Sequence, residues 1–409
     1  MKCRHCYAPL ELTLVDLGSS PPSNAYLTAA DLDAPEKWYP LRVMVCERCW
    51  LAQTRDFAQA AELFSADYAY YSSYSTSWLD HCRRYVDAMI ERFELDGSSH
   101  VVEVASNDGY LLQYVRAAGI PCTGIEPTAG TAGVARARGI ETIEEFFGVR
   151  LGSRLAEEGK CADLTIANNV LAHVPDINDF VAGFARALKP DGVATFEFPH
   201  LLRLLAENQF DTIYHEHFSY LSFTTVMTVF AANGLRVFDV ERLPTHGGSL
   251  RVYAQRADTG SRPMTQASRE LEAEERAAGI GDTRLYSGLQ GAAERIKNDL
   301  LTFLLDARRD GRRVVAYGAA AKGNTLLNFA GCRGDLLSYV ADRNPVKQGK
   351  FLPGSRIPIV AAERIERDTP DFILVLPWNL RDEIVQQLAG ARKWGARFVT
   401  AVPKLEIVP

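Results

Sequence analysis

The stretch Val101-Val102-Glu103-Val104-Ala105-Ser106-Asn107-Asp108-Gly109-Tyr110 decides the fold of this chain. Its first four residues predict a strand, and the polar turn after them leads into a predicted helix over Tyr110–Ala118. A strand that turns directly into a helix points backbone N–H groups at a ligand. The sequence therefore predicts a nucleotide-cofactor loop. Its predicted cofactor-binding residues are Glu103, Ala105, Ser106, Asn107 and Gly109.

The alternation of strand and helix continues after this loop. Further strands are predicted at Cys122–Ile125, Asp163–Ala167 and Gly192–Phe198, with helices at Ser77–Phe93 and Ile177–Ala187. This βαβ rhythm predicts a parallel sheet with helices on both faces.

A second α/β unit begins at Arg313. Its predicted strands are Val314–Tyr317, Leu337–Ala341, Phe372–Leu376 and Arg397–Thr400, and the first strand is followed by the turn Gly318-Ala319-Ala320-Ala321-Lys322-Gly323-Asn324. The charged, helical residues 261–310 between the two units are expected to present solvated helix faces that connect domains.

Two more polar points follow strands of the first unit. Glu126 ends the second strand, where a carboxylate can accept hydrogen bonds from ribose hydroxyls. Asn168 and Asn169 directly follow the strand Asp163–Ala167. The loop, the acid and the amides in this order resemble the class I S-adenosylmethionine methyltransferases. The alternative is a generic α/β turn. Both α/β units lack a GxGxxG at the first turn, which disfavours a nicotinamide-dependent oxidoreductase.

Four of the eight cysteines form two tight pairs, Cys3/Cys6 and Cys46/Cys49. The two-residue spacer lets both thiolates of a pair face one ion, and two pairs complete a closed, tetrahedral, structural zinc site. The alternative is a redox CxxC, but neither pair precedes a helix in a βαβ context. The 39-residue gap between the pairs is expected to hold a hairpin and a loop near Pro21-Pro22-Ser23-Asn24.

The bulk composition is that of a soluble globular protein, with 409 residues, 47% hydrophobic and 23% charged. The net charge of −6 gives no general attraction to nucleic acid or to an anionic membrane. No apolar run reaches the ~18 residues that a spanning helix needs, and no signal peptide is recognised. We therefore expect a cytoplasmic protein of two or three domains, with no nucleic-acid or membrane partner.

The run Tyr214-His215-Glu216-His217 gathers proton-transfer groups about a hundred residues after the cofactor loop. A surface pair of histidines or a metal site are the alternatives, but no further ligand-rich segment accompanies it. An imidazole beside a carboxylate can act as a base near neutral pH. The run therefore predicts a catalytic site.

Taken together, these motifs resemble the bacterial C-methyltransferases that act on nucleotide-linked 4-keto-6-deoxy sugars. The resemblance covers essentially the whole chain. It rests on the two CxxC pairs, Tyr70-Tyr71-Ser72-Ser73, the loop at 103–109, Asn168-Asn169-Val170-Leu171-Ala172-His173-Val174, Tyr214-His215-Glu216-His217-Phe218, His246-Gly247-Gly248-Ser249-Leu250-Arg251 and the Gly318–Asn324 turn. It implies S-adenosylmethionine in the middle domain, zinc in the N-terminal one, and a nucleotide sugar between the middle and C-terminal domains.

The chemistry of such a reaction suggests a role for each group. A proton next to the C4 ketone is acidic enough for His217 to remove, with Glu216 tuning the base. Tyr214 and His173 would donate hydrogen bonds to the developing enolate. The further candidates are Tyr70 for the cofactor and Tyr68, His246, Arg251, Lys322 and Asn324 for the substrate. The turn Gly318–Asn324 with Lys322 is a candidate diphosphate contact, and the equal alternative is a relic turn of a duplicated α/β domain.

The domains expected are a zinc module (1–65), a Rossmann-like class I methyltransferase domain (66–260), a helical connector (261–312) and a second Rossmann-like domain (313–409). Two functions stay open beside the sugar C-methyltransferase: an O- or N-methyltransferase of a small metabolite, and a non-catalytic zinc-containing binding protein. C3 is the first expectation for the methylated carbon and C5 the second. A dTDP-linked sugar is expected before a GDP-linked one, and the chain is expected to be a monomer or a weak homo-oligomer.

Overall fold

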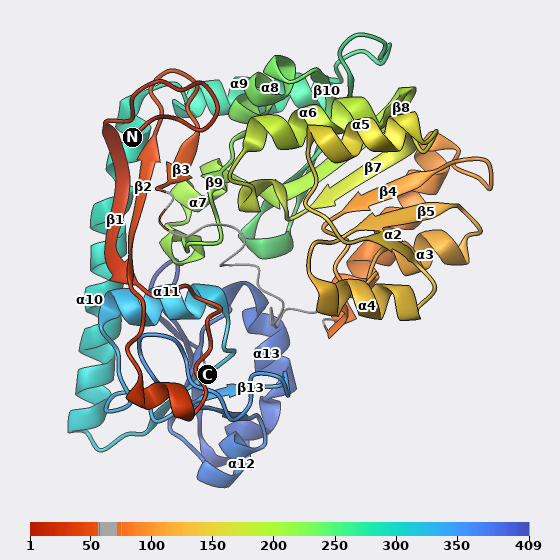
Figure 1. Cartoon of the computed structure of the whole chain (residues 1–409). Helices are drawn as coiled ribbons and strands as arrows, with labels where there is room; N and C mark the ends of the chain where they lie inside the picture. The colour runs from red at the N-terminus through yellow and green to blue at the C-terminus, as the bar shows by residue number, and fades with distance from the viewer. Residues whose placement is uncertain (56, 58–71, 75, 409) are drawn as a thin grey trace.

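The computed structural model describes residues 1–55, 57, 72–74 and 76–408, which fold around three sheets (Figure 1). A seven-stranded sheet and its helices occupy the upper right of Figure 1, a six-stranded sheet the lower left, and a four-stranded sheet connects them. None of the helices in the described ranges has both the length and the apolar composition needed to cross a bilayer.

The seven-stranded sheet has the order β10-β11-β8-β7-β4-β5-β6. Its strands are β4 (Val101–Val104), β5 (Cys122–Ile125), β6 (Glu141–Ile143), β7 (Ala162–Asn168), β8 (Leu188–Pro199), β10 (Leu235–Leu243) and β11 (Ser249–Arg256). Strands β6, β5, β4, β7 and β8 pair in parallel. The four strands predicted for this sheet therefore pair in parallel as expected, whereas strand β11, which was not predicted, runs antiparallel to both neighbours. The reason is the short turn after β10, which can only join antiparallel strands.

Both faces of this sheet are covered by helices, as alternate residues of one strand show. Val101 belongs to a core with α2 (Thr76–Phe93) and α3 (Leu112–Ala117). Val102 and Val104 belong to a core on the other face. The helices on that second face are α5 (Val149–Glu157), α6 (Ile177–Ala187) and α8 (Phe223–Ala232). Burial on both faces explains why the strand reads as an unbroken apolar run except at Glu103.

The four-stranded sheet has the order β1-β2-β3-β9. Strands β1 (Leu12–Ser20), β2 (Tyr39–Val45) and β3 (Ala52–Thr54) come from the N-terminal region and contain the expected hairpin and long loop. Strand β9 (Ser219–Tyr220) comes from the middle of the chain and pairs antiparallel with β3. The region expected to be the zinc module therefore takes one strand from the region expected to be the methyltransferase domain.

The C-terminal sheet has the order β14-β13-β12-β15-β16-β17. Its strands are β12 (Val314–Tyr317), β13 (Val340–Asp342), β14 (Ile359–Ala361), β15 (Phe372–Val375), β16 (Arg397–Thr400) and β17 (Glu406–Val408). All but β17 pair in parallel. The chain reverses its direction of winding between β12 and β15, and doubly wound sheets bind ligands at the carboxyl ends of two such strands.

The remaining helices join these layers. They are α4 (Ala129–Ala137), α7 (Leu201–Ala206), α9 (Gln266–Ala278), α10 (Leu289–Arg309), α11 (Ala321–Ala330), α12 (Arg364–Asp368) and α13 (Arg381–Gln387). Helix α10 buries an apolar stripe that includes Ile296, Leu300 and Leu304 in a core shared with β1, β2 and α11. The predicted connector is thus more than a solvated spacer, because it covers the N-terminal sheet and the C-terminal domain at once (Figure 1).

Candidate active site

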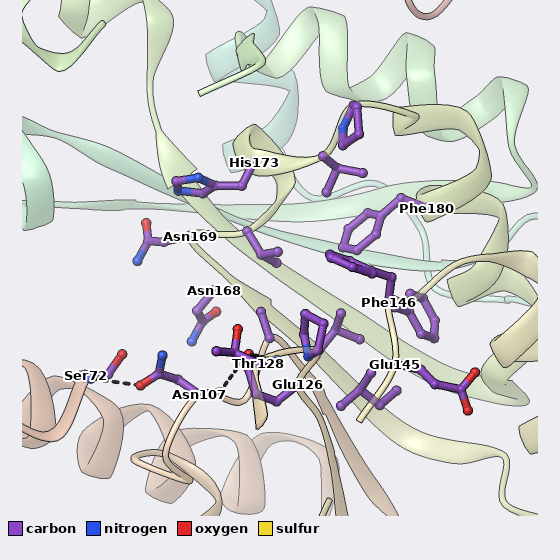
Figure 2. Close-up of a pocket in the computed structure, with 18 of the residues that line it drawn as sticks. Ser72, Asn107, Glu126, Thr128, Glu145, Phe146, Asn168, Asn169, His173 and Phe180 are labelled. Atoms are coloured by element: carbon purple, nitrogen blue, oxygen red, sulfur yellow. Dashed lines mark hydrogen bonds between the residues drawn. The ribbon is translucent and has the colours of Figure 1, made fainter. Parts of the chain in front are cut away.

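A cavity of about 370 Å³ opens at the carboxyl ends of β4, β5 and β7 (Figure 2). Of the residues predicted from the sequence, it is lined by Ala105, Asn107, Glu126, Asn168, Asn169, His173 and His246. Figure 2 shows Asn107 and Glu126 on one side of this cavity and His173 on the other. Ala105 and His246, which lie 141 positions apart in the sequence, therefore line one cavity, as parallel strands ending at one edge require.

The predicted cofactor loop turns through left-handed backbone conformations. Ala105 has φ = 58° and Asn107 has φ = 48°. Asparagine tolerates this region, whereas alanine is strained there, and strained backbone is typical of ligand-binding turns. Gly109 has φ = 76°, and a Cβ on it would lie 2.4 Å from the Ile140 side chain. The glycine is required because the loop packs directly against Ile140, the residue just before β6.

The carboxylate of Glu126 ties the first two loops together. Its Oε2 accepts a hydrogen bond from the Asn107 backbone N–H (3.0 Å), and its Oε1 accepts one from the Thr128 backbone N–H (2.9 Å). Burial raises the pKa of this carboxyl, while the backbone donors act in the opposite direction. A carboxylate held in this way keeps lone pairs that can accept from the hydroxyls of a ribose.

Two amide side chains at the cavity have polar atoms without a hydrogen-bond partner among the described residues. Among the described residues, neither the Oδ1 nor the Nδ2 atom of Asn168 has a hydrogen-bond partner, and the same holds for Asn169 Oδ1. A buried polar atom without a partner costs about 1–3 kcal/mol, so these atoms are suited to bind a polar ligand. Their position beside Glu126 fits a nucleoside cofactor with hydroxyl and amino groups.

Three predicted cofactor residues shape the loop without lining the cavity. Glu103 and Ser106 are fully buried, and burial raises the pKa of the Glu103 carboxyl. A Cβ on Gly124 would lie 2.5 Å from Ser106 Oγ, so Ser106 fills the space beside the second strand. The cofactor roles of Glu103, Ser106 and Gly109 stay predictions. Tyr68 and Tyr70 lie outside the described residues.

An aromatic wall completes the cavity and was not predicted. Phe146, Phe147 and Phe180 line it together with Trp78. Phe147 and Phe180 pack edge to face with their ring centroids 5.8 Å apart. The available signal was the Phe146-Phe147 pair just after the third parallel strand, at the same sheet edge as the loop and Glu126. Flat aromatic walls of this kind suit a purine ring.

The ring of His217 is oriented by a backbone carbonyl. His217 Nδ1 donates to the Thr212 carbonyl oxygen at 2.9 Å, so a neutral ring carries its lone pair on Nε2. The centroid of this ring lies 4.6 Å from that of His173 and 4.0 Å from that of Tyr214. The structure therefore brings together three of the four predicted catalytic side chains.

The fourth predicted catalytic side chain, Glu216, faces a different neighbour. Its Oε1 accepts from the backbone N–H and the side-chain amide of Asn24, at 3.3 and 3.2 Å. Burial raises the pKa of the Glu216 carboxyl. Glu216 is thus held against the long β1–β2 loop, and the orientation of His217 is set by Thr212. A catalytic role of Glu216 stays a prediction.

The C-terminal domain reaches this cluster through the first turn of α11. The Thr325 hydroxyl donates to the Ile213 carbonyl oxygen at 2.8 Å, and Asn324 Nδ2 donates to the Ser23 carbonyl oxygen at 2.6 Å. Lys322 Nζ donates to Asn379 Oδ1 at 2.7 Å and lies 4.6 Å from the centroid of the Trp378 ring. Lys322 and Asn324 are therefore at the carboxyl end of β12, next to the segment that contains His217.

Arg251 is placed apart from the cavity wall. It lies on β11, and its guanidinium forms ion pairs with Glu197 (2.6 Å) and Glu241 (2.8 Å). Glu197 also accepts from His81 Nε2 at 2.9 Å, and the His81 ring stacks on Trp78. Arg251 thus binds Glu197, which binds His81, and His81 stacks on Trp78 of the cavity wall. A substrate contact by Arg251 stays a prediction.

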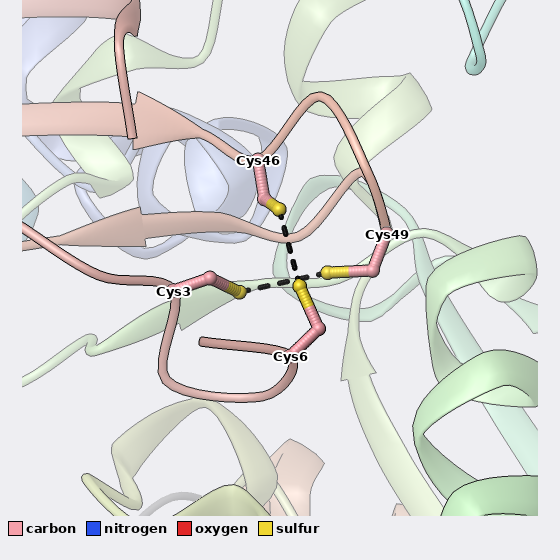
Figure 3. A group of neighbouring side chains, drawn as sticks. All are labelled: Cys3, Cys6, Cys46 and Cys49. Atoms are coloured by element: carbon pink, nitrogen blue, oxygen red, sulfur yellow. Dashed lines mark hydrogen bonds between the residues drawn. The ribbon is translucent and has the colours of Figure 1, made fainter. Parts of the chain in front are cut away.

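The four paired cysteines meet at one point of the N-terminal region (Figure 3). All four Sγ atoms lie within 4.8 Å of one another, and the Cys3–Cys49 and Cys6–Cys46 separations are 3.5 Å each. Tetrahedral zinc with Zn–S bonds of about 2.3 Å needs sulfur–sulfur separations slightly below 4 Å. The donor set therefore fits a closed structural zinc site.

Models of three protein families match the chain in succession. They describe a zinc binding domain over residues 3–64, a methyltransferase domain over residues 78–240 and a C-methyltransferase C-terminal domain over residues 244–403. Two solved structures resemble part of the chain. The magnesium protoporphyrin IX methyltransferase of Synechocystis with bound SAH is 16% identical, with a TM-score of 0.35 over 44% of this chain and 83% of that one. The PH0226 protein of Pyrococcus horikoshii is 15% identical, with a TM-score of 0.38 over 49% of this chain and 100% of that one.

A curated relative matches from end to end. The C-methyltransferase NovU of Streptomyces niveus is 38% identical over 407 residues, which cover 100% of this chain and 96% of that protein. With the family models and the donor sets described above, this match shows S-adenosylmethionine as the cofactor and a structural zinc ion at the four cysteines. The chain belongs to the family of S-adenosylmethionine-dependent C-methyltransferases.

Proposed function

We propose that this C-methyltransferase acts on a nucleotide-linked 4-keto-6-deoxy sugar and methylates the carbon next to the C4 ketone, C3 first. His217 removes the proton from this carbon, and the electron pair moves onto the ketone oxygen to give an enolate. The enolate carbon is then the nucleophile toward the methyl donor. The observation that carries the proposal is the fixed His217 ring, with its lone pair at Nε2 and with His173 and Tyr214 beside it.

The protonation state of His217 suits a base. Burial, followed by the nearby His173, lowers the pKa of His217 well below its usual value, so the ring is neutral at pH 7 and can accept a proton. The same burial disfavours the imidazolium that forms in the reaction. A bound diphosphate and a developing enolate are both negative, and they raise the pKa of His217 toward the working pH during the proton transfer.

The enolate oxygen needs donors that are already in place. Tyr214 and His173 flank His217, and His173 also lines the cofactor cavity. Burial lowers the pKa of His173 to about 4, so it is a neutral donor or acceptor at physiological pH. Preorganised donors in a water-poor site stabilise a developing oxyanion by several kcal/mol. We assign this role to Tyr214 and His173.

The nucleotide part of the substrate is proposed to lie against the C-terminal domain. The carboxyl ends of β12 and β15 flank the point where the winding of this sheet reverses, and Lys322 and Asn379 meet there. Asp211 is fully buried beside them, and burial raises the pKa of its carboxyl to about 6. Within the described ranges its Oδ1 has no hydrogen-bond partner, which marks a place for a donor group of the substrate.

The methyl donor is proposed to occupy the cavity at β4, β5 and β7. S-adenosylmethionine, when bound, supplies an electrophilic methyl group on a sulfonium sulfur. Glu126 would accept from its ribose, Asn107 and Asn168 would contact its polar edges, and Phe146 and Phe180 would enclose its purine ring. These residues exclude water from the side of the site opposite His217.

The test uses dTDP- and GDP-linked 4-keto-6-deoxy sugars in heavy water, with NMR of the products. The wild-type enzyme is expected to wash deuterium into the carbon next to the ketone and, with labelled S-adenosylmethionine, to place the label on that carbon. His217→Gln should lower both rates by about 10³-fold or more, because general base catalysis and the enolate are lost together. Its dissociation constant for S-adenosylmethionine should stay within about threefold of wild type.

His215 offers the matched control. It is two residues away, and its Nε2 faces the Tyr39 carbonyl oxygen at 3.3 Å, away from His217. His215→Gln should keep most of the turnover. Label on an oxygen or nitrogen atom, with no deuterium at carbon, would identify an O- or N-methyltransferase instead. Turnover of His217→Gln within a few-fold of wild type would remove His217 from the mechanism.

A further inference from the structure

The N-terminal sheet ends on the catalytic segment itself. Strand β3 begins three residues after Cys49 and pairs with β9, with Gln53 opposite Ser219 and Ala52 opposite Tyr220. His217 is only two residues before β9. The segment that contains the proposed base therefore leads into a strand of the sheet whose β2–β3 turn carries Cys46 and Cys49, two of the four zinc ligands.

Thr54 holds the backbone at His217. Its hydroxyl donates to the His217 carbonyl oxygen at 3.0 Å, and its backbone N–H donates to the Phe218 carbonyl oxygen at 3.1 Å. On the opposite side, the Phe218 N–H donates to the Ala172 carbonyl oxygen at 2.8 Å, next to His173. The backbone of residues 217–218 is thus fixed between β3 and the turn that presents His173.

Arg4 connects these two supports. It lies between Cys3 and Cys6, in the first zinc knuckle. Its two terminal nitrogens donate to the Thr54 carbonyl oxygen and to the Pro175 carbonyl oxygen, at 2.9 Å each. Its guanidinium carbon lies 5.4 Å from the centroid of the Phe218 ring, close enough for a cation–π contact.

The knuckle in turn fixes the position of Arg4. Its backbone N–H donates to Gln53 Oε1 at 2.9 Å, and Gln53 Nε2 donates to Cys3 Sγ at 3.3 Å. A guanidinium has several donors in one rigid plane, so it can hold two carbonyls at a defined separation, which an ammonium cannot do. Pro175 lines the cofactor cavity, and Thr54 binds the backbone of His217. Arg4 therefore joins the segment that contains His217 to the wall of the cofactor cavity.

We propose that Arg4 is a positioning residue for the methyl transfer: from the zinc knuckle it sets the place of the His217 segment relative to the cofactor wall. The inference rests on the proposed role of His217 and adds a function to the N-terminal region beyond holding a metal. A displacement of a catalytic group by about 1 Å lowers the rate by about 10²-fold. Loss of the Arg4 bridge should have an effect of this size on kcat.

The main test compares Arg4→Met with Arg48→Met. Arg48 is an exposed arginine at a similar place in the second knuckle, so it is a matched control. Arg4→Met is expected to keep about one zinc per chain and its affinity for S-adenosylmethionine within about threefold. Its kcat and its deuterium uptake into dTDP-4-keto-6-deoxyglucose should fall about 10²-fold, without a comparable rise in KM. Arg48→Met should match the wild type in all five quantities: zinc content, affinity for S-adenosylmethionine, kcat, KM and deuterium uptake.

Amide hydrogen exchange of the whole chain gives a readout that needs no substrate. Exchange over residues 213–221 should be faster in Arg4→Met than in wild type, and unchanged in Arg48→Met. Arg4→Lys provides a second variant, because it keeps a cation in the knuckle but cannot hold the Thr54 and Pro175 carbonyls at a defined separation, and it should lower kcat about tenfold. If Arg4→Met loses zinc, Arg4→Lys decides the question.

The outcomes separate this inference from the proposed function. A wild-type enzyme that never exchanges the proton next to the ketone refutes His217 as the base, whatever the variants do. The positioning role is refuted if zinc-containing Arg4→Met exchanges the proton within twofold of the wild type. Where Arg4→Met loses zinc, the same result with Arg4→Lys refutes it. A loss of S-adenosylmethionine binding in proportion to the loss of kcat also refutes it, because Arg4 would then support only the cofactor wall.

Discussion

Glu126 shows how one side chain organises the cofactor site. Its carboxylate accepts from two backbone N–H groups of neighbouring loops and faces the cavity. Glu126→Gln replaces one acceptor by a donor that faces a backbone N–H. A hydrogen bond to a charged group is worth about 1.5–3 kcal/mol, so the dissociation constant for S-adenosylmethionine should rise about 10- to 100-fold. Calorimetric titration measures this, with the exposed Glu141→Gln as control. Equal constants in the two variants would exclude Glu126 from the site.

Because His246 is buried in the folded chain, we expect the free energy of unfolding to depend on pH. Burial, followed by the nearby Lys322, lowers the pKa of His246 to about 4, while Glu197 acts in the opposite direction and His81 and His173 add to the lowering. The unfolded chain, with a pKa near ~6.5, therefore binds a proton that the folded chain does not. Stability is fully present above pH 6.5 and falls as the pH drops toward 4.

His246→Asn removes this loss without straining the backbone. The residue has φ = 56°, a left-handed conformation that asparagine tolerates. Relative to wild type, the variant should gain about 1–2 kcal/mol between pH 7.5 and pH 5. Differential scanning calorimetry of both proteins at the two pH values measures the gain. A difference in melting temperature that does not change with pH would contradict the prediction.

At the scale of elements, two 3-10 helices meet at a glycine. These are η5 (Thr245–Gly247) and η7 (Trp378–Leu380), from the middle and C-terminal domains. Gly247 has φ = 89°, and a Cβ on it would lie 2.5 Å from the Trp378 ring. Gly247→Ala should lower the free energy of unfolding by about 2–4 kcal/mol, because the backbone strain adds to the clash with the Trp378 ring.

Gly311 is the matched control for this substitution. It has φ = 69°, but a Cβ on it would meet no described atom within 4 Å. Gly311→Ala should therefore cost only the strain, about 1–2 kcal/mol. Urea unfolding of both variants gives the two values. Equal losses in the free energy of unfolding would mean that Trp378 moves aside and that the contact between η5 and η7 accommodates an added methyl group.

Much of the secondary structure was predictable, and the failures have physical causes. The bounds of β4, β5, β12, β16 and α6 agree with the sequence-based expectations, because these elements are buried or amphipathic and have clear ends. Strand β9 was missed because two residues carry no periodicity, and only its pairing with β3 makes it a strand. Strand β11 was missed because Arg251 interrupts its apolar run, and this arginine is buried only through its ion pair with Glu197.

For the molecule as a whole, the zinc cluster predicts a long-range effect. Cys49→Ser should reduce the zinc content from about one per chain to nearly none, because a closed site needs all four thiolates. The melting temperature should fall by about 10 °C or more, since several kcal/mol are lost and each kcal/mol shifts it by 2–4 °C. Elemental analysis and calorimetry measure both. Cys161→Ser, outside the cluster, is the control and should change neither.

The individual motifs of the candidate site could be predicted from the sequence. The contacts that bring these motifs together could not. The motifs around Glu126, Asn168 and His217 stand out because polar residues follow predicted strands or gather in one run. The roles of Thr212 and Arg4 depend on contacts between residues 5 to 171 positions apart. No local pattern encodes such contacts, so the orientation of His217 and its support by the knuckle needed the fold.

The core shared by the N-terminal sheet and the C-terminal domain has a consequence for synthesis of the chain. The apolar sides of β1 and β2 are covered by α10 and α11, which are translated about 250 residues later. At about 5–20 residues per second, the sheet leaves the ribosome roughly 10–50 seconds before its cover exists. Nascent chains stalled before α10 should therefore recruit chaperones at the N-terminal strands, and release of the completed chain should end that binding.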